Sequence, residues 1–474
     1  MRSRVLVSSF LLLTLLALEL GAKTPPGINS PRGYLFEPVA FLPGPAPGPE
    51  GGQMDWYFWA PSINNSGEIA FDSGITVPET GGEGVYVQRH GQIYQIARSG
   101  EEAPGGGTFG WLGAQSIIAI NQPGEVCFAF SLDPPFDISA PSGTNVGLYR
   151  CSNETGELSA VVVPDVTPAP GGGTFQGAYL QIGLNNRGDV VFGGIVPTEN
   201  GIHVPEQEYM GLGMGIFKAD KKGRITSVVS PGDPAPGGST FDFAENPWNN
   251  DSGDVAFGAH VVGDDIIDFG VPQASRIFSA ESIYVKKAAT GQILSIAHQG
   301  APAPGGGTYR LAFGPVINNS GQIVFIGDLT PSPDVAMALG VFLYTGGMTI
   351  PVARPGDAMP GGGHLANASF YVFNYQVNNA GDVAFNGTLD TTDAEGAHDH
   401  GLYVWSRGYL RLVARTGTVV PGVGTIAHLA GPIYPDWYGD LCVSYVSFND
   451  RGQVLFQATL TDGRGVLLVA TPHA

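Results

Sequence analysis

The chain has 474 residues, of which 43% are hydrophobic, so it carries enough apolar side chains for a folded core and is not a disordered polypeptide. Its 71 glycines and 37 prolines indicate many turns, and its three cysteines are too few for a disulfide scaffold. The formal net charge of −20 disfavours nucleic acid and anionic membranes as partners.

The N-terminal segment predicts export. Arg2 and Arg4 precede an apolar run over residues 5–18, and the small pair Gly21-Ala22 follows, which is the pattern of a signal peptide. We expect residues 1–22 to be cleaved and residues 23–37 to form a linker, with an uncleaved anchor as the alternative. No later run is long enough to span a membrane, so the predicted location is extracellular, periplasmic or at the cell surface.

The rest of the chain repeats the phrase Asn-x-x-Gly-x-x-x-Phe seven times. Successive copies lie 57, 64, 65, 68, 60 and 71 residues apart, which suits one four-stranded propeller blade per copy. A second phrase, a proline followed by a glycine-rich run, recurs in phase with the first. The positions of the first phrase are Asn64, Gly67, Phe71; Asn121, Gly124, Phe128; Asn185, Gly188, Phe192; Asn250, Gly253, Phe257; Asn318, Gly321, Phe325; Asn378, Gly381, Phe385; and Asn449, Gly452, Phe456.

The segments between these phrases predict an all-β protein. In the first unit, residues 56–63, 68–75, 84–88 and 92–98 are short, rich in β-branched and aromatic residues, and bounded by Gly, Asn or Pro. No segment shows a sustained helical period. We therefore predict a seven-bladed β-propeller of four-stranded blades over residues 38–471. Because the chain ends on a third strand, the last blade is closed by the N-terminal strand.

The repeated asparagines have a structural explanation. Asparagine favours the first position of a type I turn, and glycine takes the following left-handed position without a Cβ clash. The β-branched residue two positions after the glycine and the phenylalanine four positions after it share one face of the strand. We expect them to form the apolar layer between blades, and we favour this explanation over a ligand-binding role for the asparagines.

The seven copies resemble the bacterial tandem-repeat family named for the NxxGxxxF phrase, whose members carry a secretion signal and various C-terminal anchors. The resemblance covers nearly the whole mature chain and implies an exported β-propeller, without an established activity or catalytic residues to transfer. The chain departs from the family in one respect. Only Thr-Pro-His-Ala follows Ala470, so no anchor helix is visible.

The predicted blades give the molecule two distinct faces. The Asn-x-x-Gly turns lie on one face, here called the turn face; the proline-glycine crossings and the second-to-third strand loops lie on the other, the long-loop face. Basic residues concentrate near the third-to-fourth strand turns, at Lys221, Lys222, Arg224, Lys286, Lys287 and Arg407. The long loops hold a single base, Arg276, against Asp133, Asp137, Glu206, Glu208, Asp264, Asp265, Asp268, Asp328, Asp334, Asp390, Asp393, Glu395 and Asp399.

Aromatic residues accompany carboxylates where the first and seventh units meet. Residues 55–59 read Asp-Trp-Tyr-Phe-Trp, and residues 436–440 read Asp-Trp-Tyr-Gly-Asp. Stacking and hydrogen bonding by such residues suit a sugar or a cationic ligand. The alternative is that the rings fill the channel mouth and the seam. The candidate ligand-binding residues are Trp56, Tyr57, Trp111, Trp437 and Tyr438.

Metal binding is left open. The acidic loops make calcium a candidate cation, and the weak candidate ligands are Asp264, Asp265, Asp268, His398, Asp399 and His400. No other cofactor is indicated. Cys127 takes a position held by small apolar residues in other units, so we predict a packed thiol, and a bond between Cys127 and Cys151 is undecided. Arg98, His298, Arg354 and Arg415 share one position, and we interpret them as structural partners of neighbouring loops.

Three function classes follow. The favoured one is an exported binding or adhesion scaffold, a monomer whose ligand, a glycan or a protein, binds the acidic long-loop face. The second is a secreted carbohydrate-active hydrolase or lyase with Asp55, Asp436 and Asp440 as catalytic candidates. The third is a purely structural cell-surface protein. No nucleophile-elbow, zinc-protease, Cys-x-x-Cys or P-loop phrase occurs, which favours a protein that is not an enzyme.

Overall fold

The structure is a computed structural model of the chain. It describes residues 28–29, 33–76, 81–110, 118–133, 145–197, 202–204, 207–209, 212–264, 282–331, 337–368, 374–392, 396–429 and 445–473. The predicted signal peptide therefore lies outside the described residues.

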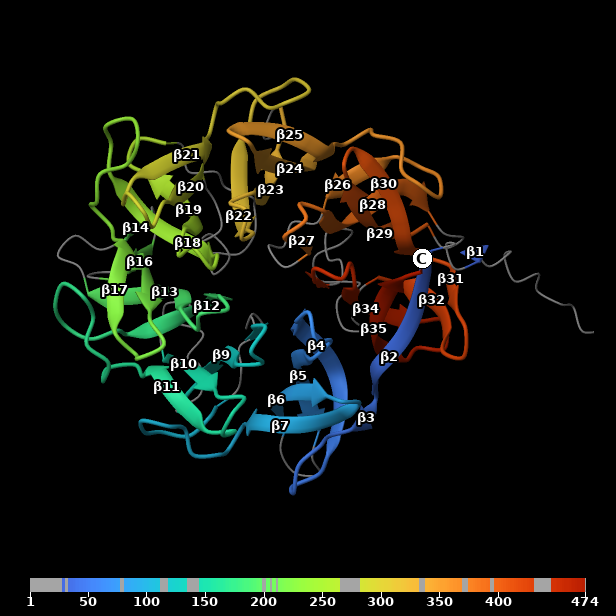
Figure 1. The fold of residues 1–474 in the computed structure, drawn as a ribbon, viewed down its shortest axis with the longest axis horizontal. Helices are drawn as coiled ribbons and strands as arrows, with labels where there is room; N and C mark the ends of the chain where they lie inside the picture. The colour runs from blue at the N-terminus through green and yellow to red at the C-terminus, as the bar shows by residue number, and fades with distance from the viewer. Residues whose placement is uncertain are drawn as a thin grey trace, which may run out of the picture.

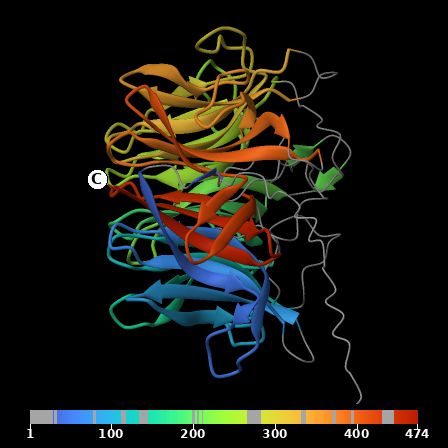
Figure 2. The same ribbon diagram turned by 90° about the vertical axis from the view of Figure 1, so that its right-hand side faces the viewer.

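Seven small sheets stand in a ring, as the two views show (Figures 1 and 2), and form a seven-bladed β-propeller. The described residues contain strands and turns but no helix, and accordingly none that is long and apolar enough to cross a membrane. The predicted fold class is confirmed.

The first four blades have the following strands. Blade 1 contains β3 (Gly44–Pro45), β4 (Gln53–Ile63), β5 (Ile69–Thr76), β6 (Gly81–Arg89) and β7 (Gln92–Arg98). Blade 2 contains β8 (Ile118–Ile120), β9 (Val126–Ser131), β10 (Val146–Cys151) and β11 (Leu158–Val162). Blade 3 contains β12 (Gly177–Leu184), β13 (Val190–Pro197), β16 (Leu212–Ala219) and β17 (Ile225–Val229), with the hairpin β14 (Ile202–Val204) and β15 (Gln207–Tyr209) between them. Blade 4 contains β18 (Phe241–Asn249), β19 (Val255–Val261), β20 (Ser282–Lys286) and β21 (Ile293–Ala297).

The last three blades complete the ring. Blade 5 contains β22 (Leu311–Ile317), β23 (Ile323–Asp328), β24 (Leu339–Thr345) and β25 (Met348–Ala353). Blade 6 contains β26 (Leu365–Ala368) and β27 (Tyr375–Val377), which both pair with β28 (Val383–Thr392), then β29 (His398–Ser406) and β30 (Tyr409–Arg415). Blade 7 contains β31 (Thr418–Val420), β32 (Gly424–His428), β33 (Val446–Phe448), β34 (Val454–Leu460) and β35 (Gly465–Pro472), together with β1 (Ile28–Asn29) and β2 (Tyr34–Leu42).

The two ends of the chain close the ring together. β2 pairs antiparallel with β35, in a register that runs from Tyr34 opposite Pro472 to Leu42 opposite Gly465, so blade 7 takes its outer strand from the N-terminus as predicted. The propeller begins earlier than the predicted boundary at residue 38, because β2 starts at Tyr34. β2 continues through Pro38 because it is an edge strand, where a missing N–H is tolerated, and its register shifts between Pro38 and Ala40.

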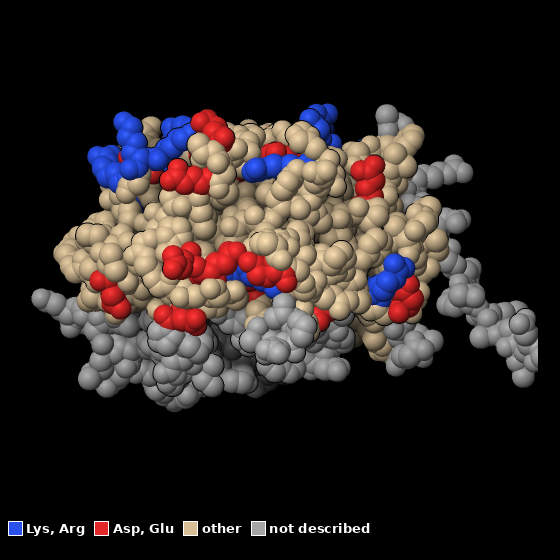
Figure 3. Space-filling view, turned by 90° about the horizontal axis from the view of Figure 1, so that it is seen from below, with Lys and Arg blue, Asp and Glu red and all other residues tan. Residues whose placement is uncertain are grey.

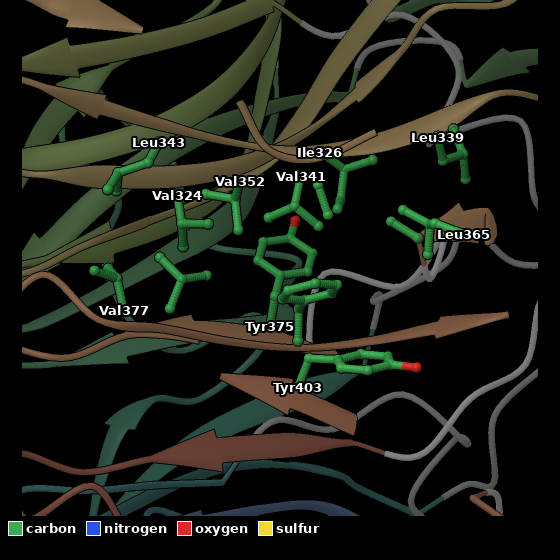
Figure 4. Close-up of a cluster of buried hydrophobic side chains, with 14 of the residues drawn as sticks. Val324, Ile326, Leu339, Val341, Leu343, Val352, Leu365, Tyr375, Val377 and Tyr403 are labelled. Carbon is green, nitrogen blue, oxygen red and sulfur yellow. The ribbon is translucent and has the colours of Figure 1, made fainter. Parts of the chain in front are cut away.

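The repeat phenylalanines form the core between blades. Each of the seven main apolar clusters contains one of them, and each cluster joins residues of two neighbouring blades. Figure 4 shows the cluster between blades 5 and 6, where Val324 and Val341 face Tyr375 and Val377. The Tyr375 hydroxyl donates to the carbonyl of Gly314 at 2.6 Å, which satisfies the polar end of a buried ring.

A second aromatic position supports six of the seven repeat phenylalanines. On the third strand of six blades, an aromatic ring lies opposite the phenylalanine with centroids 5.6–6.0 Å apart. In five of these blades a glycine precedes the ring by two residues. At Gly84, a Cβ would clash with the Tyr86 ring, so the glycine makes room for its own neighbour. Sequence analysis did not single out this Gly-x-aromatic repeat.

Two closed rings of hydrogen bonds hold the turn face. In the first ring, the side-chain amide of each repeat asparagine donates to the backbone carbonyl of the repeat asparagine in the next blade, at 2.7–3.5 Å, and Asn449 donates back to Asn64. The seven asparagines are buried. Each turn also has the predicted form, with the glycine N–H bonded to the asparagine carbonyl and a glycine φ of 76–86°.

The second ring uses the residue after each repeat asparagine. Its backbone N–H donates to the side-chain oxygen of the same position in the next blade, at 2.7–2.9 Å, again through all seven blades. Asp251 and Asp450 each also accept bonds from asparagine side chains on both sides. The members are Asn65, Gln122, Asn186, Asp251, Asn319, Asn379 and Asp450.

Candidate functional site

Blade 1 departs from regular pairing at the predicted Asp-Trp-Tyr segment. In the β4–β5 ladder, Met54 lies opposite Ile75 and Phe58 lies opposite Ser73. Residues 55–57 therefore stand against the single residue Gly74, in a bulge with two extra residues. Bulges re-aim side chains and are frequent next to functional sites.

The bulge brings Tyr57 to a buried glutamate. Glu83 pairs in register with Gly74 on the next strand, and the Tyr57 hydroxyl donates to its Oε1. Tyr57 and Glu83 come from strands about 10 Å apart, with only Gly74, which has no side chain, between them. The absence of a Cβ at Gly74 thus leaves the space in which the two side chains meet.

The buried Glu83 carboxyl has few polar partners. It is 2% exposed, and its Oε2 has no hydrogen-bond partner among the described residues. Burial raises the pKa of the Glu83 carboxyl well above its ordinary value, and no charged group contributes to the shift. Because an unpaired charge is costly to bury, this environment favours the neutral form of the Glu83 carboxyl.

Two further carboxyls belong to the same blade. Asp55 is partly exposed, but its Oδ1 is buried and has no hydrogen-bond partner among the described residues. Asp72 is 1% exposed and accepts a hydrogen bond from the Trp59 backbone N–H at 3.0 Å. Burial raises the pKa of Asp72 as well. Groups with pKa values shifted by burial are more frequent at functional sites than elsewhere. We call Asp55, Tyr57, Asp72 and Glu83 the blade 1 acid cluster.

Aromatic packing joins this cluster to blade 7. The Trp59 ring centroid lies 5.5 Å from Tyr57 and 4.9 Å from Tyr445, which precedes the inner strand of blade 7. Tyr57 and Trp59 are 7% and 8% exposed. These two rings therefore fill the seam between blades 1 and 7, as in the alternative interpretation, and do not offer a stacking surface.

Several predicted site residues lie outside the described residues: Asp436, Asp440, Trp111, Trp437, Tyr438, Asp265 and Asp268. Trp56 lies on β4, but its side chain is also outside the description. The predicted catalytic set is thus represented here by Asp55 alone.

The predicted metal ligands in blade 6 do not converge. His398, Asp399 and His400 follow one another on β29, so Asp399 points to the opposite face from the two histidines. Asp399 pairs with Arg415 at 3.0 Å, and His398 bonds the Leu389 carbonyl at 2.9 Å. In blade 4, the Asp264 carbonyl lies 3.3 Å from His260. Among the described residues, no group of three or more His, Cys, Asp or Glu side chains is arranged to hold a metal ion.

Two of the acids assigned to the long loops are instead ion-pair partners on strands, Asp328 buried and Asp399 partly buried. Asp328 ends β23, is 0% exposed and pairs with Arg310 at 2.7 Å, and Asp399 pairs with Arg415. Arginine neutralises both carboxylates locally. The expectation that these two acids contribute to an acidic surface is therefore wrong. Asp133 and Asp390 are exposed.

The recurrent arginines are structural partners of loops, as interpreted. Arg98 donates to the Gly51 carbonyl at 2.7 Å, and Arg354 donates to Gly306 at 2.7 Å, while Arg415 donates to Gly361. Each arginine holds the proline-glycine crossing that leads into its own blade. His298 instead bonds the neighbouring carbonyl of Gln299.

The cysteine thiols of blade 2 are separate. Cys127 on β9 lies opposite Arg150 on β10, so these two side chains share one face of the sheet. Cys151 follows Arg150 on β10, so its thiol points to the opposite face. Both thiols are free and buried, so Cys127 and Cys151 do not form the disulfide bond that the sequence left undecided. Burial raises the pKa of Cys127 to about 12, in keeping with a packed thiol.

Sequence reasoning missed Asp72 and Glu83. A signal was present for Asp72, because the residue after the repeat phenylalanine is Ala129, Gly193, Gly258, Ile326, Asn386 or Gln457 in the other units. A carboxylate at that position is specific to the first unit. Glu83 had a weaker signal, as it precedes the Gly-x-aromatic phrase, a position with varied residues elsewhere.

Solved structures similar to this chain concern its fold alone. The β-propeller domain of the Trilobed protease from Pyrococcus furiosus is 12% identical, with a TM-score of 0.47, over 88% of this chain and 93% of that one. A polysaccharide lyase, PL25 ulvan lyase, is 10% identical, with a TM-score of 0.44, over 94% of this chain and 98% of that one. A search of curated protein sequences gives no match.

A family assignment covers most of the chain. Residues 27–271 and 274–431 match the model of a family described as a family of unknown function, DUF7453. The matched ranges include all the repeats except the last copy of the Asn-x-x-Gly phrase. The chain belongs to the DUF7453 family.

Proposed function

We propose that this chain is an exported binding scaffold that takes an extracellular ligand on its long-loop face, centred on the blade 1 acid cluster. The observation that carries the proposal is that Asp55 and Glu83 each have a buried carboxyl oxygen with no hydrogen-bond partner among the described residues, although the Asp55 side chain as a whole is partly exposed. Buried polar atoms in native proteins are nearly always paired, so such exceptions call for an explanation.

The geometry supports a ligand as that explanation. Asp55 and Tyr57 lie on a bulge that breaks the sheet, which costs ladder hydrogen bonds, and Glu83 stands opposite them across Gly74. The long-loop end of the blade is the place where connections vary in length between units, and such loops on a rigid scaffold commonly carry binding. A hydroxyl or amine group of a ligand would satisfy the carboxyl oxygens.

Export and ligand class belong to the same proposal. The signal-like N-terminus supports an extracellular setting, and carboxyl oxygens without a described partner suit a ligand rich in hydrogen-bond donors, such as a glycan or a basic protein segment. Calcium is a further candidate, because the long loops are rich in carboxylates.

The test is equilibrium binding of the chain from residue 23 to a panel of probes: dextran, alginate, chitosan, oligolysine and calcium. Asp55→Asn and Glu83→Gln should each weaken binding of the responding probe at least tenfold. Glu102→Gln serves as the matched control, since Glu102 is an exposed acid on the crossing loop after blade 1. A probe that binds wild type and both variants equally would contradict the proposal.

The runner-up function is a carbohydrate-active hydrolase or lyase. It is favoured by one observation, that burial raises the pKa of both Asp72 and Glu83, since a carboxyl whose pKa is raised is better suited to general acid catalysis than an ordinary one. Release of reducing ends or unsaturated products from the same polysaccharides would support it. Activity that survives Glu83→Gln and Asp72→Asn would exclude these residues as the acid.

A further inference from the structure

The turn face carries an uneven distribution of charge. Five cations lie on neighbouring turns of blades 3 and 4: Arg187, Lys221, Lys222, Arg224 and Lys287. We call this set the cationic rim. In Figure 3, Lys and Arg side chains are grouped at the upper left of the molecule, on the side where blades 3 and 4 lie.

The ion pairs of the rim expose their positive member. Lys221 is 62% exposed and its partner Glu125 is 9% exposed, and the pair Arg187 and Asp189 shows 52% against 14%. Arg224 is 79% exposed against 31% for Asp220, and Lys287 is 35% exposed against 9% for Asp254. Two pairs on other blades show the reverse order: Arg464 and Asp462 are 42% and 51% exposed, and Arg415 and Asp399 are 6% and 15% exposed.

The carboxylates are held inward by the turns themselves. Asp220 accepts the backbone N–H groups of Lys222 and Arg224 at 2.9 Å, and Asp254 accepts that of Ala288 at 2.9 Å. The acids therefore fix the turns, and the cationic tips project outward. The outer surface of this rim is positive although the protein carries a net charge of −20.

The net charge decides which kind of anion can approach. A planar anionic surface would meet the whole turn face, including Asp450 of the second ring on blade 7, and would be repelled by the molecule as a whole. A linear polyanion can contact the rim alone, because charges more than about 10 Å away are largely screened at physiological salt.

We infer that the cationic rim binds a linear anionic polymer, such as a sulfated or carboxylated polysaccharide. Binding there leaves the long-loop face pointing away from the polymer. The chain is thus held by one face while the opposite face is free, which is an interaction separate from the ligand site of blade 1.

Binding of the full mature chain to dextran sulfate tests the inference, with neutral dextran of the same length as the control polymer. The double variant Lys222→Gln/Arg224→Gln should weaken binding at least tenfold and lessen its dependence on salt concentration. The matched variant Arg407→Gln/Arg411→Gln removes the same charge from blade 6 and should change binding less than twofold. Melting temperatures of both variants check that the fold is retained.

Three results would overturn the inference: equal binding to dextran and dextran sulfate, equal loss in both double variants, or binding to anionic phospholipid vesicles without binding to dextran sulfate. The last result would assign the rim to membranes. Glu83→Gln should bind dextran sulfate as strongly as wild type does, which separates this site from the blade 1 acid cluster.

Discussion

The two faces of this propeller satisfy their polar groups in opposite ways. On the turn face, every repeat asparagine and every residue after it takes part in a ring of hydrogen bonds that passes through all seven blades. At the long-loop end of blade 1, carboxyl oxygens of Asp55 and Glu83 are buried without a partner among the described residues. We therefore assign the repeat phrase to stability, and the place where blade 1 departs from regular strand pairing to the candidate site.

A substitution in the first ring gives the largest expected effect. Asn318→Ala removes the bond from its side chain to the Asn378 carbonyl at 2.7 Å and strands the N–H groups of Ser320 and Gln322. We expect a loss of about 2–4 kcal/mol in the free energy of unfolding, because buried groups left unpaired cost about 1–3 kcal/mol each. Denaturant unfolding measures it. Asn153→Ala, at an exposed asparagine, is the control and should lose less than about 1 kcal/mol.

The second ring predicts a smaller effect. Asp251 accepts the Asn186 backbone N–H at 2.8 Å and the side-chain amides of Asn186 and Asn319 at 2.8 and 2.6 Å. Asp251→Asn keeps an oxygen for the Asn186 backbone N–H but places an amide donor against the two side-chain amides, so we expect a loss of about 1–2 kcal/mol by denaturant unfolding. Asp133→Asn, an exposed acid on the other side, is the control, and an equal loss there would remove the distinction between the faces.

Glu83 predicts a change with pH rather than a fixed loss. Its raised pKa means that the folded state binds the proton more tightly than the unfolded state, so its contribution to stability is present at low pH and is lost as pH rises above about 4.5. Glu83→Gln cannot ionise. Its stability relative to wild type should therefore rise by about 1 kcal/mol or more between pH 4 and pH 8, since one pKa unit corresponds to about 1.4 kcal/mol.

Thermal or denaturant unfolding across that pH range makes the measurement. Glu102→Gln, at an exposed acid, should show no such trend. A pH-independent difference between wild type and Glu83→Gln would mean that the carboxyl is ionised in the folded protein and compensated by a partner.

The substitution Asp55→Asn has the smallest expected effect on the free energy of unfolding, and the sign of that effect distinguishes a functional from a structural role. Asp55→Asn removes a partly buried charge without a described partner, so the free energy of unfolding should stay within about 0.5 kcal/mol of wild type or increase. Functional residues are often retained at a cost in stability. A clear loss of stability on calorimetry would make Asp55 a structural residue and weaken its role in the proposed site.

Most of the fold was predictable because the repeat is periodic. The Asn-x-x-Gly turn, the apolar face of the second strand and the closure by the N-terminal strand all follow from residue spacing and local turn chemistry. The rings were not predictable in the same way. Asn64 and Asn121 are 57 residues apart, and only the packing of blades shows that one donates to the other.

The candidate site was predictable in part. The Asp-Trp-Tyr segment stood out by composition, and Tyr57 does reach a carboxylate. Its partner Glu83 was missed because a bulge and a missing side chain at Gly74 bring the two together, and neither can be derived from the alternation of residues. The burial of Trp59 was likewise set by blade 7, through Tyr445.

Amide hydrogen exchange tests the contrast between rings and ordinary turns most directly. The backbone amides of Asn65, Gln122, Asn319 and Asn379 are bonded across blades, whereas Gly91 and Gly408 lie in two-residue turns on the same face. We predict that the ring amides exchange as slowly as the strand core and the amides of Gly91 and Gly408 exchange at least a hundredfold faster. Exchange of both groups at similar, fast rates would show that the rings do not hold the turn face.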